Sequence, residues 1–420
     1  MNSVAVGILV LIPIALTISA AVTFAMIRIA PKIGFVDKPG GRKIHANPKP
    51  LGGGVGVVCG LLVPLAIIGV SLRLAHTQVG TWTVPDPQHE LSWRFEALDH
   101  VDVLGQSLPV SAHLVNGAKH QLPLLLAFVA GILVMHLMGL IDDRKALGPY
   151  SKLIVQLLVA GLLATFFKEV RALTAFGTVP SIILTVLWIT AITNAFNFLD
   201  NMDGLSAGTA AVCTTAFLIT TLLIGQWFVA ATLACLLGAL LGFLIFNFPP
   251  AKIFMGDAGS LVVGFVLGVL TVRTTFLPPG QSFGAGWYAV FAPAIVLAVP
   301  LYDLIVVSVI RISRGKSPFQ GDRNHFSHRL VARGMSRRTA VLTIYLVSAA
   351  TAIAAIILPH VNTPFAAMLI FMQTLLVLGV VLLLEQHPVN EGEGPRGEGQ
   401  GELSTPHLES SSSSSLTPRP

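Results

Sequence analysis

The chain has 420 residues, of which 54% are hydrophobic and only 11% are charged. A soluble domain carries roughly 25% charged residues, so this composition excludes both an ordinary soluble globule and a disordered chain. The net charge is +6, from 26 Lys and Arg against 20 Asp and Glu, and the placement of these charges is more informative than their sum.

Eleven apolar stretches follow one another along the chain, separated by Gly, Pro or charged residues, and each approaches the roughly 20 residues that a membrane helix needs. They cover residues 4–28, 51–72, 122–141, 152–167, 179–198, 205–224, 227–248, 258–277, 287–310, 340–358 and 363–384. No basic segment precedes the first stretch, so we interpret it as a retained span and not as a cleaved signal peptide. The sequence therefore predicts an all-α polytopic integral membrane protein with about 11 transmembrane helices over residues 1–384.

Lys and Arg indicate how these spans are oriented, because short loops rich in them stay in the cytoplasm. With the N-terminus outside, 18 of the 26 Lys and Arg lie on cytoplasmic segments and six on outward loops. The long outward loop, residues 73–121, is interpreted as a small hairpin or an interfacial lid. Residues 385–420 are rich in Glu, Gly and Ser, and we expect them to form a disordered cytoplasmic tail.

The first cytoplasmic segment, GGRKIHANPKPLGGGVG at residues 40–56, combines basic side chains with three consecutive Gly. The Gly run is compatible with close approach of a ligand and equally with tight helix packing. The adjacent pair Asp142 and Asp143 then closes the third span. Two neighbouring carboxylates repel each other at a low-dielectric edge, so a metal ion, another cation or a proton is expected beside them. The alternative is a helix C-terminus that happens to carry two charges.

The segment NAFNFLDNMDGLSAG, residues 194–208, repeats a polar side chain every three residues: Asn194, Asn197, Asp200 and Asp203. This spacing places them along one side of a helical turn at the inner end of the fifth span. Carboxylate and carboxamide oxygens are ligands that suit Mg²⁺. An alternative for Asp203 is that it caps the next helix.

Two further cytoplasmic segments complete the polar set. In NFPPAKIFMGDAGS, residues 247–260, Asp257 stands at the start of a helix, where capping alone would also explain it. In GKSPFQGDRNHFSHRL, residues 315–330, the cationic side chains are dense enough to hold a diphosphate. A basic loop facing anionic lipid is the alternative, and we prefer it for the Arg residues that follow.

Together, these five segments resemble the polyprenyl-phosphate N-acetylhexosamine-1-phosphate transferases over roughly residues 30–345. The branch that transfers GlcNAc-1-phosphate fits best, because of RKIH at residues 42–45 and the GKSPF…DRNH stretch. The chain departs from the family in having His325-Phe326-Ser327-His328 where His-x-His-His is frequent, and in its long outward loop.

The resemblance implies transfer of GlcNAc-1-phosphate from a UDP-sugar to polyprenyl (undecaprenyl) phosphate, with release of UMP, at the cytoplasmic face of the cell inner (plasma) membrane. It implies Mg²⁺ as cofactor, with Mn²⁺ as an alternative ion, no nucleic-acid partner, and a homodimer as a further expectation. The implied site residues are Asp142 and Asp143 as catalytic groups, Asn197 and Asp257 as metal ligands, and Lys152, Asp200, Asp203, Asn247, Arg323, His325 and His328 as substrate-binding groups.

Three other functions remain open at this stage. The nearest is the related transfer of phospho-MurNAc-pentapeptide in peptidoglycan synthesis. An ion-coupled transporter is motivated by Asp303, a carboxylate inside the ninth stretch. A CDP-alcohol phosphotransferase would require an Arg where this chain has Gly208.

Overall fold

The computed structural model describes residues 3–37, 48–78, 100–103, 106–109, 112–274, 276, 287–318, 324–361 and 363–386. Almost all of this part of the chain is helical. The α-helices are α1 (Ser3–Lys32), α2 (Gly53–Gln78), α3 (Ala112–Arg144), α4 (Pro149–Phe166), α5 (Thr178–Leu199), α6 (Leu205–Leu223), α7 (Trp227–Asn247), α8 (Asp257–Arg273), α10 (Ala292–Val296), α11 (Ala298–Ser313), α12 (Phe326–Ala332), α13 (Arg337–Ile357) and α14 (Pro364–Gln386).

Four short strands accompany the helices in the described ranges. β1 (Val36–Asp37) pairs with β2 (Lys49–Pro50), and β3 (His100–Val103) pairs with β4 (Gln106–Pro109), both antiparallel. Short 3-10 turns lie at Lys168–Val170, Thr174–Phe176, Trp287–Phe291 and Leu358–His360. The predicted all-α class therefore holds for the bundle itself, with two small strand pairs added at its ends.

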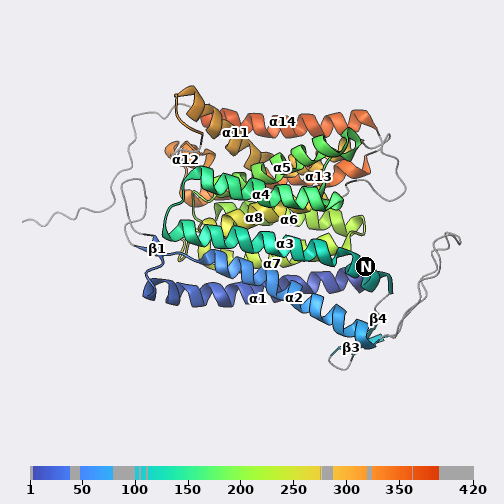
Figure 1. The fold of residues 1–420 in the computed structure, drawn as a ribbon. Helices are drawn as coiled ribbons and strands as arrows, with labels where there is room; N and C mark the ends of the chain where they lie inside the picture. The colour runs from blue at the N-terminus through green and yellow to red at the C-terminus, as the bar shows by residue number, and fades with distance from the viewer. Residues whose placement is uncertain are drawn as a thin grey trace, which may run out of the picture.

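The long helices lie side by side in one bundle, with α1 along one edge and α14 along the opposite edge (Figure 1). α8 occupies the centre, where it packs against α3 and α5, and each of its residues from 258 to 271 is buried. A helix that is apolar all round has no solvent-facing stripe and needs such a central position. α8 thereby fixes where its first residue, Asp257, stands.

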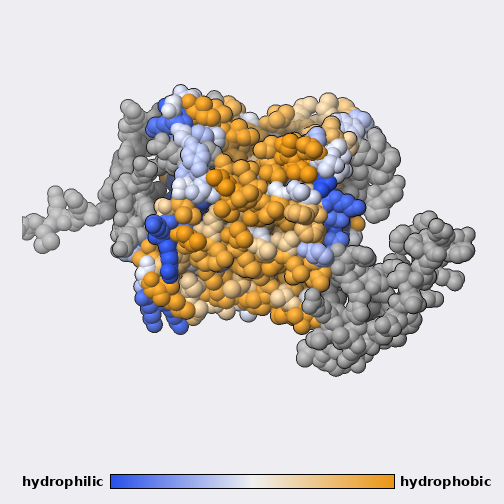
Figure 2. All heavy atoms as spheres, in the orientation of Figure 1, coloured by the Kyte–Doolittle hydropathy of each residue, from blue (hydrophilic) through white to orange (hydrophobic). Residues whose placement is uncertain are grey.

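On the face seen in Figure 2, apolar side chains cover the middle of the bundle, and hydrophilic side chains gather toward its two ends. Among the described residues, nine helices are long and apolar enough to cross a membrane. A tenth candidate is the pair formed by residues 287–296 and α11, which is bent by 68°. The predicted count of 11 is therefore not confirmed, although a helix covers most of every predicted stretch.

The two stretches outside the count of nine have physical reasons for their shape. α8 has only 17 residues, or about 25 Å of helix, and it can be short because other helices enclose it. The break between α10 and α11 lies just before Pro300, in the first turn of α11. A Pro ring collides with the carbonyl group four residues earlier, here that of Val296, so the chain cannot continue as one straight helix.

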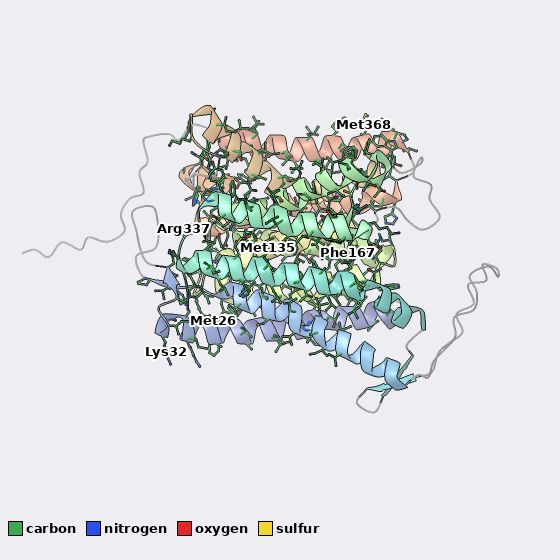
Figure 3. All side chains as sticks on the ribbon, viewed as in Figure 1. Met26, Lys32, Met135, Phe167, Arg337 and Met368 are labelled. Atoms are coloured by element: carbon green, nitrogen blue, oxygen red, sulfur yellow. The ribbon has the colours of Figure 1, made fainter. Side chains whose placement is uncertain are left out.

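The two ends of the bundle differ in what they carry. The N-terminus and the β3–β4 pair lie at one end, and β1 and α12 lie at the other (Figure 1). Lys32 and Arg337, both on segments predicted to be cytoplasmic, lie at the end with β1 and α12, and Phe167 lies toward the opposite end (Figure 3). We call the end with β1 and α12 the site end, because the acidic side chains described below gather there.

The segments predicted to lack helices are shorter than expected. α2 continues to Gln78 and α3 already begins at Ala112, so both helices extend into the predicted loop 73–121. A small hairpin, one of the two forms predicted for this loop, is present there as β3 and β4. α14 extends to Gln386, and the rest of the predicted tail lies outside the described residues.

Candidate active site

The start of α8 is held by a carboxylate from the last turn of α3. Asp143 Oδ1 accepts a hydrogen bond from the backbone N–H of Asp257 at 2.8 Å, and its Oδ2 accepts one from Ala258 at 3.2 Å. Unpaired N–H groups and the positive end of the helix dipole both favour an anion at this position. The residue before α8 is Gly256, where a Cβ atom would come within 2.4 Å of Asp143 Oδ2. The two segments therefore fit together only with glycine at this turn.

Lys152, in the first turn of α4, joins two carboxylates from different helices. Its Nζ lies 2.7 Å from Asp257 Oδ2 and 3.1 Å from Asp142 Oδ2. Asp142 Oδ1 also accepts the backbone N–H of Leu147 at 2.6 Å, which fixes the turn between α3 and α4. The three charged side chains are 14% to 22% exposed, so the group is shielded but open on one side. The cation expected beside Asp142 and Asp143 is thus supplied, in this structure, by the protein itself.

α5 contributes an amide to the same group. Asn197 Nδ2 donates to Asp257 Oδ1 at 2.9 Å and to Ser260 Oγ at 3.0 Å. Ser260 lies three residues after Asp257 on α8 and so faces the same side of that helix. The sequence reasoning did not single out Ser260, although this helical spacing from Asp257 was a usable signal. Asn194, one turn earlier, donates instead to Gln156 Oε1 of α4 at 2.5 Å.

Asp200 is the first residue beyond α5 and lies beside the same carboxylates. Burial raises its pKa above the usual value, and the nearby charges of Asp257 and Asp143 raise it further. A backbone hydrogen bond from Gly256 acts in the opposite direction. Asp142, Asp143, Asp200 and Asp257 thus converge at one end of the bundle. Only Lys152 is seen to neutralise them among the described side chains, so the site attracts a further cation.

The turn that follows carries Asp203, whose Oδ2 accepts the backbone N–H of Ala251 at 2.9 Å. The adjacent Gly204 donates its N–H to Asn247 Oδ1, and Asn247 Nδ2 donates to the carbonyl of Ile253, both at 2.9 Å. Asn247 is only 4% exposed. Its whole amide therefore ties the turn after α5 to the segment before α8, and in this structure it faces protein and not open solvent.

The capping alternatives are wrong for both aspartates. The N-cap residue of α8 is Gly256 and that of α6 is Gly204, and neither of these residues makes a side-chain capping bond. The first N–H groups of α8 are capped by Asp143 of α3 instead. The carboxylates of Asp257 and Asp203 instead bind groups from other segments. Tertiary contacts at the site end therefore explain the positions of both aspartates. A role for them in a functional site requires such contacts.

The Gly run beside α2 serves helix packing. The N–H groups of Gly53 and Gly54 donate to the carbonyls of Phe254 and Met255, each at 3.0 Å. A Cβ atom on Gly54 would lie 2.4 Å from the backbone nitrogen of Gly259. Of the two alternatives for this run, close packing against the segment around Asp257 is therefore the one observed. The basic residues at 42, 43 and 45 lie outside the described residues.

The short helix α12 brings the two predicted histidines to the site end. His325, just before α12, is 5% exposed, and both its ring nitrogens have protein partners: Asp303 Oδ2 at 2.8 Å and Arg311 Nη2 at 3.3 Å. His328 is partly exposed, and its ring centre lies 6.4 Å from that of His325. Arg323 lies outside the described residues.

α12 is joined to the acidic group through α5 and the turn after it. Ser327 Oγ donates to Asn201 Oδ1 at 2.6 Å, and the ring of Phe198 contacts that of His325 with 5.7 Å between centres. Ser327 stands where the middle imidazole is frequent in the family, and it is 1% exposed. At this position the chain therefore has an internal contact, which no pattern in the sequence indicated.

No group of three or more His, Cys, Asp or Glu side chains forms a ready-made metal cage within the described ranges. The donor chemistry nevertheless suits Mg²⁺, because the group offers hard oxygen atoms from carboxylates and an amide. Mg²⁺ commonly keeps several waters and takes only one or two carboxylates together with substrate phosphates. An open acidic site of this kind fits that mode of binding.

Comparison with known proteins indicates the same family as the sequence motifs do. Residues 125–275 match the family model described as glycosyl transferase family 4. The chain is 29% identical over 355 residues to the probable undecaprenyl-phosphate N-acetylglucosaminyl 1-phosphate transferase of Bacillus subtilis, covering 82% of this chain and 83% of that protein.

Two further relatives cover similar shares. The decaprenyl-phosphate N-acetylglucosaminephosphotransferase of Mycobacterium tuberculosis is 30% identical over 342 residues, or 76% of this chain and 74% of the relative. The undecaprenyl-phosphate alpha-N-acetylglucosaminyl 1-phosphate transferase of Escherichia coli is 26% identical over 336 residues, or 77% and 76%. The stretch shared with each relative spans most of the membrane bundle.

Proposed function

Because the chain belongs to the polyprenyl-phosphate N-acetylhexosamine-1-phosphate transferases of glycosyl transferase family 4, we propose that it acts on GlcNAc. In this reaction GlcNAc-1-phosphate passes from UDP-GlcNAc to a polyprenyl phosphate such as undecaprenyl phosphate, and UMP leaves. The product is a lipid-linked sugar diphosphate, the first intermediate of a cell-envelope polysaccharide. The relatives' names supply both the sugar and the class of lipid.

One observation supports this proposal above the others: the carboxylates of α3 and α8 meet around Lys152 at one end of an apolar bundle. The reaction joins two anions, a lipid phosphate and a nucleotide diphosphate, so it needs cationic groups and a divalent ion to hold them together. The lipid phosphate lies at the membrane surface, level with the end of such a bundle. The acidic group and the apolar bundle meet both requirements.

We propose that Asp257 and Asn197 would hold Mg²⁺, or Mn²⁺ in its place. When bound, the ion neutralises charge on the phosphates as they approach each other. Asp143 fixes the backbone of Asp257 through two hydrogen bonds and so sets the position of that ligand. Lys152 adds a second positive charge on the same carboxylate, where a phosphate oxygen can also reach it.

Asp142 is proposed to take the proton from the lipid phosphate. The phosphate oxygen then attacks the β-phosphorus of UDP-GlcNAc, and the bond to the UMP oxygen breaks. In an alternative route an aspartate first forms a covalent phospho-sugar, which the lipid phosphate resolves. Incubation with UDP-GlcNAc alone separates the two, since only the covalent route releases up to one equivalent of UMP without acceptor.

The remaining predicted site residues are proposed to bind the donor. Asp203 would accept the imide N–H of uracil, and Arg323 and the partly exposed imidazole of His328 would meet the diphosphate and the sugar. Asp200 and Asn247 line or brace the same region through the turn after α5. For Asn247 the bonds to Gly204 and Ile253 favour a bracing role.

The test uses detergent-purified protein, undecaprenyl phosphate and UDP-GlcNAc, with UMP release as the readout. We expect turnover that stops with EDTA and returns with Mg²⁺, and no turnover with UDP-MurNAc-pentapeptide. Asp257→Ala should abolish it, whereas Asp37→Asn, which removes a carboxylate from β1 at the same end, should not. Release from the pentapeptide donor alone, or an active Asp257→Ala, would refute the assignment.

The site end is proposed to face the cytoplasm, where UDP-sugars are made, with the protein in the plasma membrane. Charge placement supports this orientation, since Lys32 and Arg337 lie at that end (Figure 3). Labelling of a single introduced Cys in the α3–α4 turn of intact and opened cells would test it. The expected homodimer stays a prediction.

The structure removes the reason for considering an ion-coupled transporter. Asp303 is buried, yet its carboxylate is fully used within the protein by His325 and the backbone N–H of Phe326. An isolated intramembrane carboxylate suggests an ion path. A carboxylate that caps a short helix at the bundle end does not.

A further inference from the structure

α12 and the residue before it are held by a buried charged group that the proposed chemistry does not use. It consists of Asp303 and Arg311 from α11 and His325 from the start of α12. Asp303 is 0% exposed, Arg311 2% and His325 5%. Charged side chains this deeply buried need specific partners, so each contact here is informative.

The hydrogen bonds determine which nitrogen of His325 carries its proton. Arg311 has only donors, so where its Nη2 lies 3.3 Å from Nε2 of His325, that nitrogen must be the acceptor. The proton then lies on Nδ1, which donates to Asp303 Oδ2 at 2.8 Å. His325 is therefore a neutral ring with its proton on Nδ1, and neither nitrogen is left for a substrate.

The same carboxylate also fixes the helix. Asp303 Oδ1 accepts the backbone N–H of Phe326, the first residue of α12, at 2.7 Å. Arg311 is held in turn by the carbonyl of Pro318 at 2.6 Å and lies 5.0 Å from the ring centre of Phe198. Phe198 adjoins Asn197 on α5, so the group connects α12 directly to the helix that carries the proposed metal ligand.

We propose that Asp303 is a positioning residue for the transferase: it sets the tautomer of His325 and the start of α12, and His325 acts through this network and not by touching the substrate. Only the kinetic consequence of this proposal rests on the proposed function; the assignment of the His325 tautomer does not. α12 carries His328 and follows Arg323, so a displaced α12 weakens donor binding, whereas the carboxylates of α3 and α8 stay in place.

The first test is spectroscopic and needs no activity. Nitrogen NMR of protein labelled at histidine, assigned with His325→Asn, should show a neutral His325 with the proton on Nδ1. In Asp303→Asn the amide can donate to Nδ1, which forces the proton to Nε2 against the donors of Arg311. A wild-type ring protonated on Nε2, or on both nitrogens, overturns the proposal.

The second test is kinetic. Asp303→Asn should lower kcat/KM about 10- to 100-fold, mainly through a higher KM for UDP-GlcNAc, as expected for the loss of a charge-assisted hydrogen bond. His325→Asn keeps a donor at the position of Nδ1 and should retain more activity than His325→Gln, whose amide matches Nε2. The reverse order, or a fall in kcat at unchanged KM, means that His325 itself acts on substrate and refutes the proposal.

The control is Trp188→Phe, which removes a hydrogen bond of 2.9 Å to Thr271 between α5 and α8 and leaves the site end untouched. It should keep wild-type KM. If a variant does not fold, the tautomer of the wild-type ring still decides the proposal. If the wild-type protein shows no UMP release while His325 carries its proton on Nδ1, the proposed function fails and the assignment of the network stands.

Discussion

The substitution Gly256→Ala examines the fit between α3 and α8 with a single methyl group. The new Cβ would lie 2.4 Å from Asp143 Oδ2, whereas ordinary contact begins at 3.4 Å. Asp143 must therefore withdraw by about 1 Å, and a misplacement of that size at a reacting group can cost about 100-fold in rate. We expect kcat for UMP release to fall by this order.

Backbone strain accompanies this substitution and must be separated from the contact. Gly256 has φ 71° and ψ 176°, a region that is essentially restricted to glycine and costs other residues of order 1–3 kcal/mol. Gly177, the N-cap of α5, has φ 90° and ψ 172°, and a Cβ there would meet nothing within 4 Å. Gly177→Ala thus carries the same kind of strain without touching the site.

Both variants should lose similar thermal stability, and only Gly256→Ala should lose turnover. In the double variant with Asp143→Ala the contact no longer exists, so the glycine substitution should add little further loss. If Gly256→Ala retains activity within about threefold of Gly177→Ala, a difference of under 1 kcal/mol in activation energy, the position of Asp143 does not control catalysis and the reasoning fails.

Three further predictions follow from contacts at the same end. Lys152→Met should lower kcat/KM at least about tenfold, because an uncompensated pair of carboxylates repels both diphosphate and lipid phosphate, and Lys152→Arg should restore part of it; equal activity of the two variants would contradict this. Asn247→Leu should reduce thermal stability by about 1–3 kcal/mol, since it leaves the N–H of Gly204 and the carbonyl of Ile253 without their partner. Gly208→Ala should destabilise the contact of α6 with α13, because its Cβ would lie 1.8 Å from Tyr345 Oη. Tyr345→Ala in that background should recover part of the loss in a thermal unfolding assay, and no recovery would place the cause elsewhere.

Much of the bundle could be predicted from hydropathy, because a membrane helix must satisfy its own backbone and therefore appears as one long apolar run. What hydropathy cannot show is where a helix lies among its neighbours. The shortness of α8 follows from its central position, and the bend before α11 follows from one Pro. Neither feature changes the apolar character of the run, so a count of runs exceeds the count of straight spans.

The membership of the acidic group was also predictable, since Asp142, Asp143, Asp200 and Asp257 all lie at predicted cytoplasmic span ends. Their pairing was not. Lys152 was expected to meet substrate, and in the structure it bridges two of these carboxylates. Likewise Asp303 looked isolated in the sequence, because its partner His325 follows 22 residues later, beyond the end of α11.

The position of Lys152 has a consequence for how the protein should respond to the removal of metal ions. The ammonium group of Lys152 offsets part of the carboxylate charge at the site end, so we expect the bundle to assemble in the membrane without an external ion. We therefore expect chelators to abolish the proposed transferase activity without unfolding the protein. Small domains whose fold depends on a bound metal behave differently, because chelators unfold them. The proposed Mg²⁺ would have to compete with this Lys for the same carboxylates, so we expect it to bind firmly only together with a substrate that supplies phosphate oxygens.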